Sequence, residues 1–473
     1  MTDQAARSAL LAAAAAHLDG GGFERELARR VAIRSASQEA DAGPALHAYL
    51  ADELLPTLHS MGFDGRLHDN PVAGAGPLLV AHRIEDPALP TVLGYGHGDV
   101  IRGQDAAWTR GAGPWQLAAD GERLYGRGTA DNKGQHSINL AALAQVLAAR
   151  RAQGRGLGFN LKWLVETGEE TGSPGLAAFC AAHRAELAAD VLIASDGPRL
   201  RAEAPTVFLG SRGVVNFELS LQLRDGAHHS GNWGGLLRNP GTVLANAIAC
   251  LVDGRGRILI DALRPPAIPA NVRAALAGLA VGGGANDPVV DADWGEPGLT
   301  PAERVFGWNT LEVLAFTCGN PQHPVNAIPP AARAHLHLRY VVGTDVSRLG
   351  EAVQGHLAAH GFGHIEVTVG ESMAATRLDP DNPWVRFTLE SIARSTGPTS
   401  PAPVLLPNLG GSLPNDVFAD ILGLPTVWIP HSYPGCQQHA PDEHLLRPVV
   451  REALQLMAGL YWDLGEPALR PAA

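Results

Sequence analysis

Histidines and carboxylates stand at the ends of apolar runs that are typical of buried strands. The runs at residues 91–95, 159–165 and 190–195 are each followed within a few residues by an acidic or imidazole side chain. Such side chains are the ligands that hard and borderline divalent cations prefer. In open α/β sheets, sites form just outside the carboxyl ends of the strands. We therefore expect one metal site, and its candidate residues are His97, Asp99, Asp131, Glu169, Glu170, Asp196 and His439.

Each candidate also has a purely structural interpretation. A single His97-x-Asp99 occurs in ordinary surface loops, although a carboxylate beside a bound imidazole commonly accepts its second ring N–H. Asp131 begins a predicted helix, where it could serve as the N-cap. Glu169 and Glu170 repel each other unless a cation lies between them, but acidic pairs are common in solvated turns. The joint occurrence is the stronger argument, because one shared site explains every candidate.

The elements that carry these residues alternate between strands and helices. This rhythm is typical of a mostly parallel sheet covered by helices on both faces, which is an α/β fold. It is interrupted after residue 210 and resumes near residue 380. The predicted strands are 77–83, 91–95, 159–165, 190–195, 404–406 and 426–429, and the predicted helices are 5–18, 23–33, 44–61, 131–151, 174–188, 382–396 and 441–462.

The interruption reads as a separate α+β domain. Residues 214–223 alternate between apolar and polar side chains, as a half-exposed antiparallel strand does. The elements that follow give the order β-α-β-β-α-β, the split βαβ arrangement. They are 214–223, 240–252, 311–316, 332–340, 345–360 and 365–369. We expect domain bounds of 1–210, 211–375 and 376–473, with the first and last segments forming one α/β domain.

Composition excludes several classes of protein. The formal net charge of −12 makes nucleic acid an unfavourable partner. The chain has four cysteines and no C-x-x-C motif, so we expect reduced, buried thiols and a cytoplasmic protein. No apolar run reaches the roughly 20 residues that span a bilayer. Residues 10–17 mimic a short signal core, but we expect a helix there because alanine favours helices. Export is the alternative.

Five motifs contain the candidate residues and carry a family resemblance. They are Gly96-His97-Gly98-Asp99, Gly126-Arg127-Gly128-Thr129-Ala130-Asp131-Asn132-Lys133-Gly134, Glu169-Glu170-Thr171-Gly172, Ser195-Asp196-Gly197 and His439-Ala440-Pro441-Asp442-Glu443. In this order and spacing, the chain resembles the co-catalytic zinc peptidases and deacylases. That family includes carnosine dipeptidases, carboxypeptidase G, aminoacylase, acetylornithine deacetylase and succinyl-diaminopimelate desuccinylase. The likeness covers nearly the whole chain. It implies a catalytic α/β domain and an inserted lid domain that also forms a homodimer interface.

The resemblance also implies a role for each residue of the site. Two Zn²⁺ ions, or Mn²⁺ or Co²⁺ in their place, would share a water molecule, with Asp131 as the bridging ligand. Glu169 would be the general base and Asp99 would orient a ligand histidine. The reaction implied is hydrolysis of an amide bond in a small, carboxylate-bearing substrate. The full ligand set implied is His97, Asp131, Glu170, Asp196 and His439.

Two residues of the inserted domain resemble substrate-contacting positions of the family. His229, in His228-His229-Ser230-Gly231, matches a histidine that stabilises the oxyanion, in its own or a partner subunit's site. Ala227 stands where many dipeptidases of the family have Asp. Arg339 matches an arginine that binds a substrate carboxylate, a task that suits a guanidinium group. The alternatives are a loop histidine and a charge on the surface of a strand.

A glycine-rich segment near the end of the chain resembles the substrate loop of the dipeptidase branch. Its residues are Gly410, Gly411 and Ser412. Leu409 replaces the Glu that often precedes this loop, which favours a deacylase over an enzyme that recognises a free amino end.

Three functions remain open at this point. The first is a dizinc dipeptidase or carboxypeptidase, the second is a deacylase of N-acyl amino acids or aryl amides, and the third is a catalytically silent, metal-binding dimer scaffold. Other templates fail, because the chain contains no H-E-x-x-H motif, no G-x-S-x-G elbow and no P-loop.

Overall fold

The computed structural model describes residues 3–282, 288–397 and 400–471. These residues form two compact units. The first unit comprises residues 1–210, 378–406 and 414–473, and the second comprises residues 211–377 and 407–413. The expected domain bounds differ from these at two places, since the inserted segment ends at residue 377 rather than 375 and one short segment lies in the other unit. The sequence placed the short segment 407–413 in the α/β domain, whereas it packs within the second unit.

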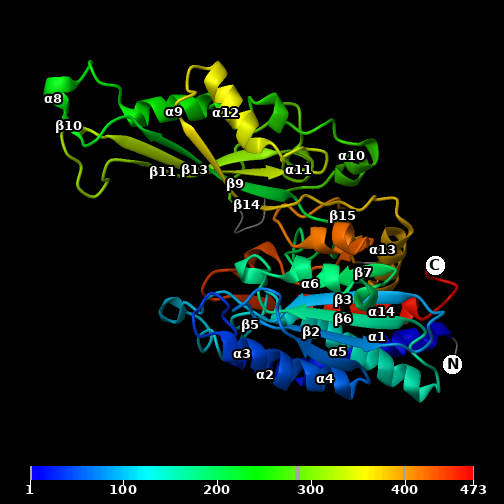
Figure 1. Ribbon diagram of the computed structural model, residues 1–473. Coiled ribbons are helices and arrows are strands. Elements are labelled where there is room, and N and C mark those ends of the chain that lie inside the picture. Colours follow the sequence, from blue (N-terminus) through cyan, green and yellow to red (C-terminus); the bar gives the residue numbers. More distant parts are fainter. Residues whose placement is uncertain (1–2, 283–287, 398–399, 472–473) are drawn as a thin grey trace. The chain divides into compact units, whose positions relative to one another are not determined.

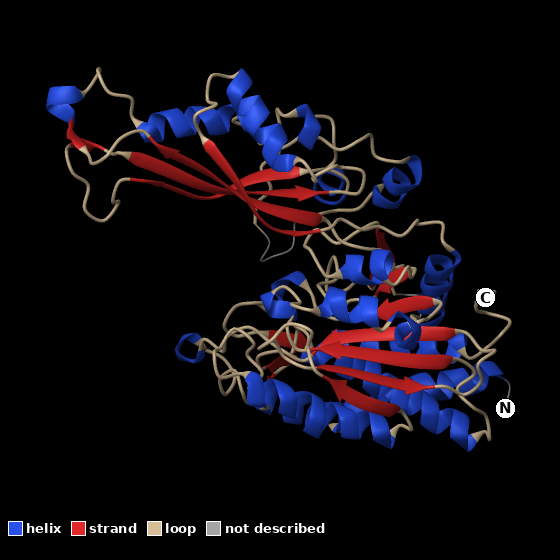
Figure 2. Cartoon of the chain, viewed as in Figure 1, coloured by secondary structure: helices blue, strands red, loops and turns tan. Residues whose placement is uncertain are grey.

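An eight-stranded sheet forms the centre of the first unit (Figures 1 and 2). The strand order is β1-β2-β6-β3-β7-β16-β8-β15, and the four central strands β6, β3, β7 and β16 run parallel. Their residues are almost all buried, as strands covered on both faces must be. The bounds are β1 Asp64–His68, β2 Leu78–Arg83, β3 Thr91–His97, β6 Asn160–Glu166, β7 Val191–Ala194, β8 Thr206–Phe208, β15 Val404–Leu406 and β16 Thr426–Trp428.

Helices cover this sheet on both faces, which confirms the predicted fold class. Figure 1 shows α2, α4 and α5 on one side of the sheet and α6 on the other. The helices are α1 Asp3–Asp19, α2 Gly22–Ala32, α3 Gly43–Ala48, α4 Leu55–Ser60, α5 Lys133–Ala152, α6 Leu176–Ala182, α7 Arg184–Leu187, α13 Pro383–Ser395 and α14 Arg447–Leu464. None of the described helices is both long and apolar enough to cross a membrane.

Some predicted helices begin or divide elsewhere. The helix expected at 174–188 is two helices, α6 and α7, which meet at His183. The last helix starts at Arg447 rather than near 441, because β17 (His444–Leu446) comes first. This strand pairs with β5 (Arg123–Tyr125), which pairs with β4 (Ala118–Asp120). The small sheet therefore brings residues near 444 beside residues near 125.

The second unit contains an antiparallel sheet of order β11-β13-β9-β14. Alternate residues of its strands, such as Phe217 and Leu336, are buried against helices α9 and α12. The element order β-α-β-β-α-β agrees with the prediction. The bounds are β9 Gly213–Gln222, β10 His228–His229, α8 Ser230–Trp233, α9 Pro240–Leu251, α10 Ala270–Leu276, α11 Pro301–Phe306, β11 Thr310–Cys318, β12 Ala327–Ile328, β13 Ala331–Tyr340, α12 Leu349–Ala359 and β14 Glu366–Met373.

The cysteines are all unpaired, as expected, but only two are fully buried. Cys180 and Cys436 lie in the interior of the first unit, whereas Cys250 and Cys318 are half-buried in the second. The alanine-rich start of the chain is helix α1, whose Leu10 and Ala14 are buried in the core of the first unit.

A buried carboxylate fastens α1 and α13 to the last helix. Asp463 is fully buried, and it accepts hydrogen bonds from the guanidinium groups of Arg7 and Arg394 and from the Ser391 hydroxyl. Replacing Asp463 by Ala removes the carboxylate that pairs with Arg7 and leaves Arg394 with Glu390 alone, at 3.9 Å. We expect the free energy of unfolding of the first unit to fall by about 3 kcal/mol. Urea titration followed by tryptophan fluorescence measures this, with the exposed Asp52→Ala as the control. Equal stability of the two variants would contradict the role given to Asp463.

Candidate metal centre

The candidate residues meet because the strands that precede them are neighbours. His97 is the last residue of β3, and Asp196 follows β7 by two residues. Glu169 and Glu170 follow β6 in a short 3₁₀ turn, Glu169–Thr171. Since β6, β3 and β7 are adjacent and parallel, their carboxyl ends lie at one edge of the sheet. The topology thus explains why residues distant in sequence face one another.

Asp131 occupies the middle of the group. It lies between β5 and α5, and His97 Nε2 is 2.9 Å from its Oδ1 atom. His439 Nε2 is 2.9 Å from the other carboxylate oxygen, Oδ2. The two imidazoles therefore approach opposite oxygens of one carboxylate. Asp131 is not a helix cap, because the residue at the N-cap of α5 is Asn132.

Two further carboxylates complete two groups that share Asp131. Asp196 Oδ2 lies 3.7 Å from His97 Nε2, and Glu170 Oε2 lies 3.1 Å from His439 Nε2. In each group, His97-Asp131-Asp196 and Asp131-Glu170-His439, the nearest ligand atoms lie within 4.8 Å of one another. The arrangement can hold two cations with a common carboxylate.

The unsatisfied polar atoms of the site fit such cations. Asp196 Oδ2 and Glu170 Oε1 are buried, and neither has a hydrogen-bond partner among the described residues. A buried carboxylate oxygen without a partner is costly. A divalent cation with nitrogen and oxygen ligands would satisfy both atoms, and the mixed His and carboxylate set suits Zn²⁺, Mn²⁺ or Co²⁺.

Burial and mutual repulsion shift the titration of the carboxylates. Burial and, after it, the charge of Asp131 raise the pKa of Glu170 to about 7 and that of Asp196 to about 6. Burial also raises the pKa of Asp131, but hydrogen bonds from His439 and His97 outweigh it and lower the net pKa. The hydrogen bonds that His439 donates to Asp131 and Glu170 raise the pKa of His439 to about 11. Crowded negative charge of this kind is what a cation relieves.

Glu169 lies beside these groups without belonging to either. Its Oε2 is 4.0 Å from His97 Nε2, and its side chain is mostly buried. Burial raises the pKa of Glu169 well above its usual value, and the charges of Asp196 and Asp131 add to the effect. A carboxylate with a raised pKa is a better proton acceptor.

Asp99 holds neighbouring residues of the site in place through hydrogen bonds. Its carboxylate accepts hydrogen bonds from the backbone N–H groups of Glu169 (3.2 Å) and Glu170 (3.1 Å) and from the Ser37 hydroxyl (2.6 Å). Oδ1 is also 3.4 Å from His97 Nδ1, and the Asp99 carbonyl oxygen is 3.1 Å from the same nitrogen. Asp99 therefore contacts the ring expected to be a ligand and also fixes the turn that carries the two glutamates.

Two residues without an expected role hold Asp131 in place. Glu443 is buried and accepts hydrogen bonds from the backbone N–H groups of Ala130 (2.8 Å) and Asp131 (3.1 Å), while Arg127 pairs with its other oxygen at 2.6 Å. Gln438 donates to Asp131 Oδ2 at 2.5 Å. Glu443 belongs to one of the five motifs but had no expected role, because its partners Ala130 and Asp131 are more than 300 positions away in the chain. No motif or spacing in the sequence indicated a role for Gln438.

The remaining candidates belong to the second unit. Arg339 Nη1 donates to Ser412 Oγ at 2.7 Å, and the Ser412 hydroxyl donates to the Arg212 carbonyl at 2.7 Å. Arg212 Nε donates to the Gly410 carbonyl at 2.8 Å. Gly411 is exposed beside them. Arg212 was not among the predicted site residues, because a single arginine before a strand has no distinguishing pattern.

His229 stands apart from that group. It is exposed, and its Nδ1 atom accepts a hydrogen bond from the Gly231 N–H at 3.2 Å. Its expected contact with an oxyanion stays a prediction.

Comparison with known proteins finds sequence similarity to two dipeptidases, the first of which the chain matches over well under half of its length. It is 34% identical over 190 residues to the Beta-Ala-His dipeptidase of Mus musculus, a match that covers 40% of this chain and 37% of that protein. It is 26% identical over 355 residues to the Cysteinylglycine-S-conjugate dipeptidase of Corynebacterium striatum, covering 72% of this chain and 73% of that protein.

Solved structures show the same fold over almost the entire chain. Human carnosine dipeptidase 1 matches with a TM-score of 0.76 and 22% identity, covering 97% of this chain and 99% of that one. The M20 family metallo-carboxypeptidase Sso-CP2 of Sulfolobus solfataricus matches with a TM-score of 0.77 and 25% identity, covering 94% and 99%. Residues 93–463, most of the chain, match the family described as Peptidase family M20/M25/M40. The protein is therefore an enzyme that belongs to peptidase family M20/M25/M40, the family of metallopeptidases that its motifs resemble.

Proposed function

We propose that the protein is a dipeptidase that hydrolyses the amide bond of a small substrate with a free carboxylate. One observation carries the proposal. Two groups of potential ligands share the carboxylate of Asp131, and Glu169 lies beside them without joining either. The dipeptidase relatives from mouse and Corynebacterium striatum support the substrate class.

The residues that would hold two divalent cations, Zn²⁺ in the first instance, are those of the two groups. Asp131 would be shared, His97 and Asp196 would complete one set, and Glu170 and His439 would complete the other. When bound, such a pair of cations would supply Lewis acidity, which lowers the pKa of water and polarises a carbonyl group.

The chain's own residues would move the protons. Glu169 would accept a proton from the attacking water and then donate it to the leaving amine, because burial raises the pKa of its carboxyl group. Asp99 would keep Glu169 in position through the backbone hydrogen bond at the turn. His439, half-exposed, lies on the open side of the group.

Residues of the second unit would bind the substrate. Arg339 would contact the substrate carboxylate through its guanidinium group, and its bond to Ser412 would hold it in orientation. Gly410 and Gly411 would let the substrate approach the backbone closely. His229 would stabilise the oxyanion, in its own subunit or in a partner's.

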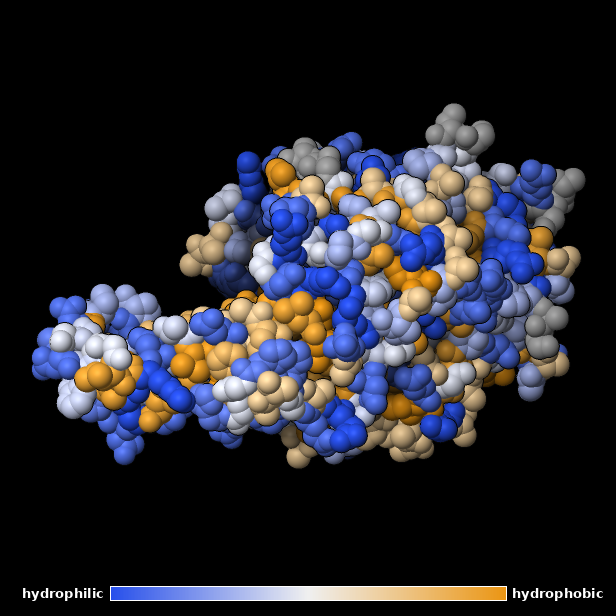
Figure 3. Space-filling model, turned by 90° about the horizontal axis from the view of Figure 1, so that it is seen from above, coloured by the Kyte–Doolittle hydropathy of each residue, from blue (hydrophilic) through white to orange (hydrophobic). Residues whose placement is uncertain are grey.

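We propose a homodimer formed through the second unit. Apolar side chains are exposed at the end of this unit that carries α8 (Figure 3, left), and contiguous exposed apolar surface often marks an interface. Strand β11 is also an edge strand of its sheet. The exposed apolar residues of α8, of β11 and of the loops beside them are Trp233, Leu236, Val313, Leu314, Phe316 and Val325.

A deacylase is the second candidate, favoured by one feature. Leu409 precedes the glycine-rich loop, and its side chain is buried. The apolar Leu409 side chain offers no carboxylate to a substrate amine, and the backbone at this position pairs with that of Ser211. The silent scaffold is excluded by membership in the enzyme family.

A substrate panel tests the proposal. The enzyme, freed of metal by chelation and then loaded with Zn²⁺, Mn²⁺ or Co²⁺, should hydrolyse dipeptides and lose all turnover when the chelator is returned. Initial rates of ninhydrin-reactive product on dipeptides and on the matching N-acetyl amino acids measure this. Faster release from the N-acetyl amino acids would establish the deacylase, and no turnover on either class would refute the proposed reaction.

Replacing Glu169 by Gln removes the proton acceptor but keeps the shape of the side chain. We expect kcat to fall by on the order of 100- to 10,000-fold, while metal content measured by elemental analysis stays that of the wild type. The exposed Glu122→Gln is the matched control. Activity close to the wild type would show that another group is the base.

Removing the Asp99 carboxylate should loosen the metal centre. In Asp99→Ala, the N–H groups of Glu169 and Glu170 lose their acceptor. We expect metal affinity to fall by about 10- to 100-fold, as for other residues that orient ligands. Competition with a chromophoric chelator measures the affinity, and circular dichroism monitors folding. Unchanged affinity in the folded variant would limit Asp99 to a structural role, and the exposed Asp64→Ala is the control.

A further inference from the structure

Three more side chains of the first unit form a group with the chemistry of metal ligands. They are His68, His183 and Glu186, and their nearest ligand atoms all lie within 4.8 Å of one another. His68 is the last residue of β1, His183 lies where α6 and α7 meet, and Glu186 belongs to α7. All three are half-buried, and the group shares no residue with the two groups at Asp131.

One aromatic ring holds both imidazoles of this group. Phe179 of α6 is 2% exposed, and it stacks on the ring of His183 with centroids 4.2 Å apart. The same ring meets the imidazole of His68 edge to face at 5.1 Å. Because this packing restricts the rotamers of both histidines, less side-chain entropy is lost when an ion binds to them.

The Glu186 carboxylate faces both imidazoles. Its Oε2 atom is 2.8 Å from His183 Nδ1, and its Oε1 atom is 3.8 Å from His68 Nε2. Each oxygen therefore faces a different ring nitrogen. Two imidazoles and one carboxylate are a ligand set that Zn²⁺ accepts in proteins, with a water molecule in the fourth position.

An exposed arginine supplies positive charge to the same three residues. Arg66 lies two residues before His68 on one face of β1, since alternate residues of a strand point the same way. Its Nη2 atom donates to Glu186 Oε1 at 3.2 Å, and its Nε atom donates to His68 Nε2 at 3.3 Å. His68 Nε2 is thus an acceptor, and the lone pair that a metal needs points into the group. The Arg66 side chain is 69% exposed, so a cation that replaces it breaks only a weak surface ion pair.

A second group, in the other unit, is already internally bonded. It consists of Cys250, His356 and His360. The side chain of each donates to a backbone carbonyl, and the acceptors are Ala247 at 3.0 Å, Cys250 at 2.8 Å and His356 at 2.8 Å. The two imidazoles also stack on each other at 4.2 Å. An ion would have to compete with these contacts.

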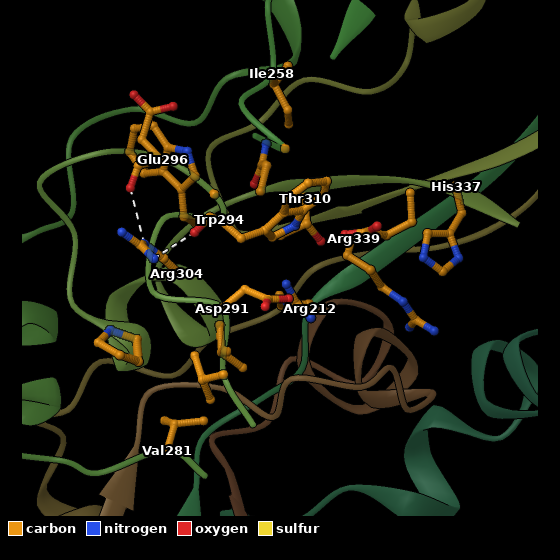
Figure 4. A pocket seen from close by; sticks show the side chains of 18 residues that line it. Arg212, Ile258, Val281, Asp291, Trp294, Glu296, Arg304, Thr310, His337 and Arg339 are labelled. Carbon is orange, nitrogen blue, oxygen red and sulfur yellow. Dashed lines mark hydrogen bonds between the residues drawn. The ribbon is translucent and has the colours of Figure 1, made fainter. Parts of the chain in front are cut away.

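A cavity of about 410 Å³ in the second unit is a contrasting case (Figure 4). Glu296 and His337 line it, but among the described residues no three of its histidines and carboxylates form a ligand group. Arg212, Arg304 and Arg339 line it as well, and their charges repel a cation. The cavity is therefore no candidate for a metal ion.

We propose that His68, His183 and Glu186 bind a divalent metal ion, Zn²⁺ in the first instance, which fastens β1 to α6 and α7. Strand β1 is the end strand of the eight-stranded sheet and pairs with β2 alone. An ion held by the strand and by the helices would join them on the face that carries Arg66, and its binding free energy would stabilise the fold. The proposal does not depend on the proposed function, because the ligands of the two sites are different.

The first test counts bound metal. The wild type and the variants His68→Gln and Glu186→Gln are freed of metal by chelation, dialysed against Zn²⁺ and examined by elemental analysis. Each variant should retain about one ion per chain fewer than the wild type, whatever number the centre at Asp131 holds. The exposed His59→Gln and the half-buried Cys250→Ala should match the wild type. Equal zinc content in the wild type and both variants, or a loss in Cys250→Ala instead, would overturn the proposal.

The second test keeps all three ligands and changes only the competing charge. In Arg66→Gln, the zinc affinity of this site should rise about fivefold, the factor that one surface ion pair supplies. Calorimetric titration measures it in the binding step that His68→Gln lacks. Arg66→Lys, which keeps the charge, should stay near the wild type. An unchanged or lower affinity in Arg66→Gln would show that the ion does not bind where the guanidinium group lies.

The third test asks whether the ion fastens the edge of the sheet. At a zinc concentration about ten times the dissociation constant, amide hydrogen exchange in residues 64–68 should slow about tenfold. This segment contains no ligand of the centre at Asp131, so it reports on the new site alone. The effect should be absent in His68→Gln, whose fold is checked by circular dichroism. Exchange in the wild type that does not respond to zinc would overturn the fastening role.

Discussion

Mutual repulsion among buried carboxylates is the constraint on which the site depends. Asp131, Glu169, Glu170 and Asp196 approach one another at a single edge of a sheet, where burial makes each negative charge expensive. In the folded chain, the imidazoles of His97 and His439 contact the two carboxylate oxygens of Asp131. The fold therefore stores unfavourable electrostatic energy at this edge, and that energy favours the capture of divalent cations.

Hydrogen bonds from remote segments keep the carboxylates together in spite of this repulsion. Asp99 holds the turn of the two glutamates through their N–H groups, and Glu443 holds the loop of Asp131 in the same manner. Both supports are themselves buried acids, so charge-assisted hydrogen bonds to the backbone offset the cost of burying them. The precision of the centre comes from these supports rather than from the strands alone.

The sequence predicted the parts of the fold that rest on periodicity and order. Apolar runs located β3, β6 and β7, and the parallel order of these strands made a shared site at His97, Glu170 and Asp196 predictable. The supports were not predictable, because Glu443 and Gln438 act on a residue that approaches them only in the folded chain. Arg212 was not predicted because a single arginine before a strand has no distinguishing pattern, and the short segment 407–413 was assigned to the wrong unit because no periodic signal marks it.

Residues 407–413 pack within the second unit, and this limits the transfer of the inserted domain to another protein. The polypeptide passes between the units four times, and the third and fourth passages enclose a segment that both Arg212 and Arg339 hold. Removing residues 211–377 would leave residues 407–413 without the surface on which they pack. Grafting them into another host would leave both guanidinium groups without their bonds to it. The inserted domain is thus interlocked with its host and cannot be transplanted as a simple cassette.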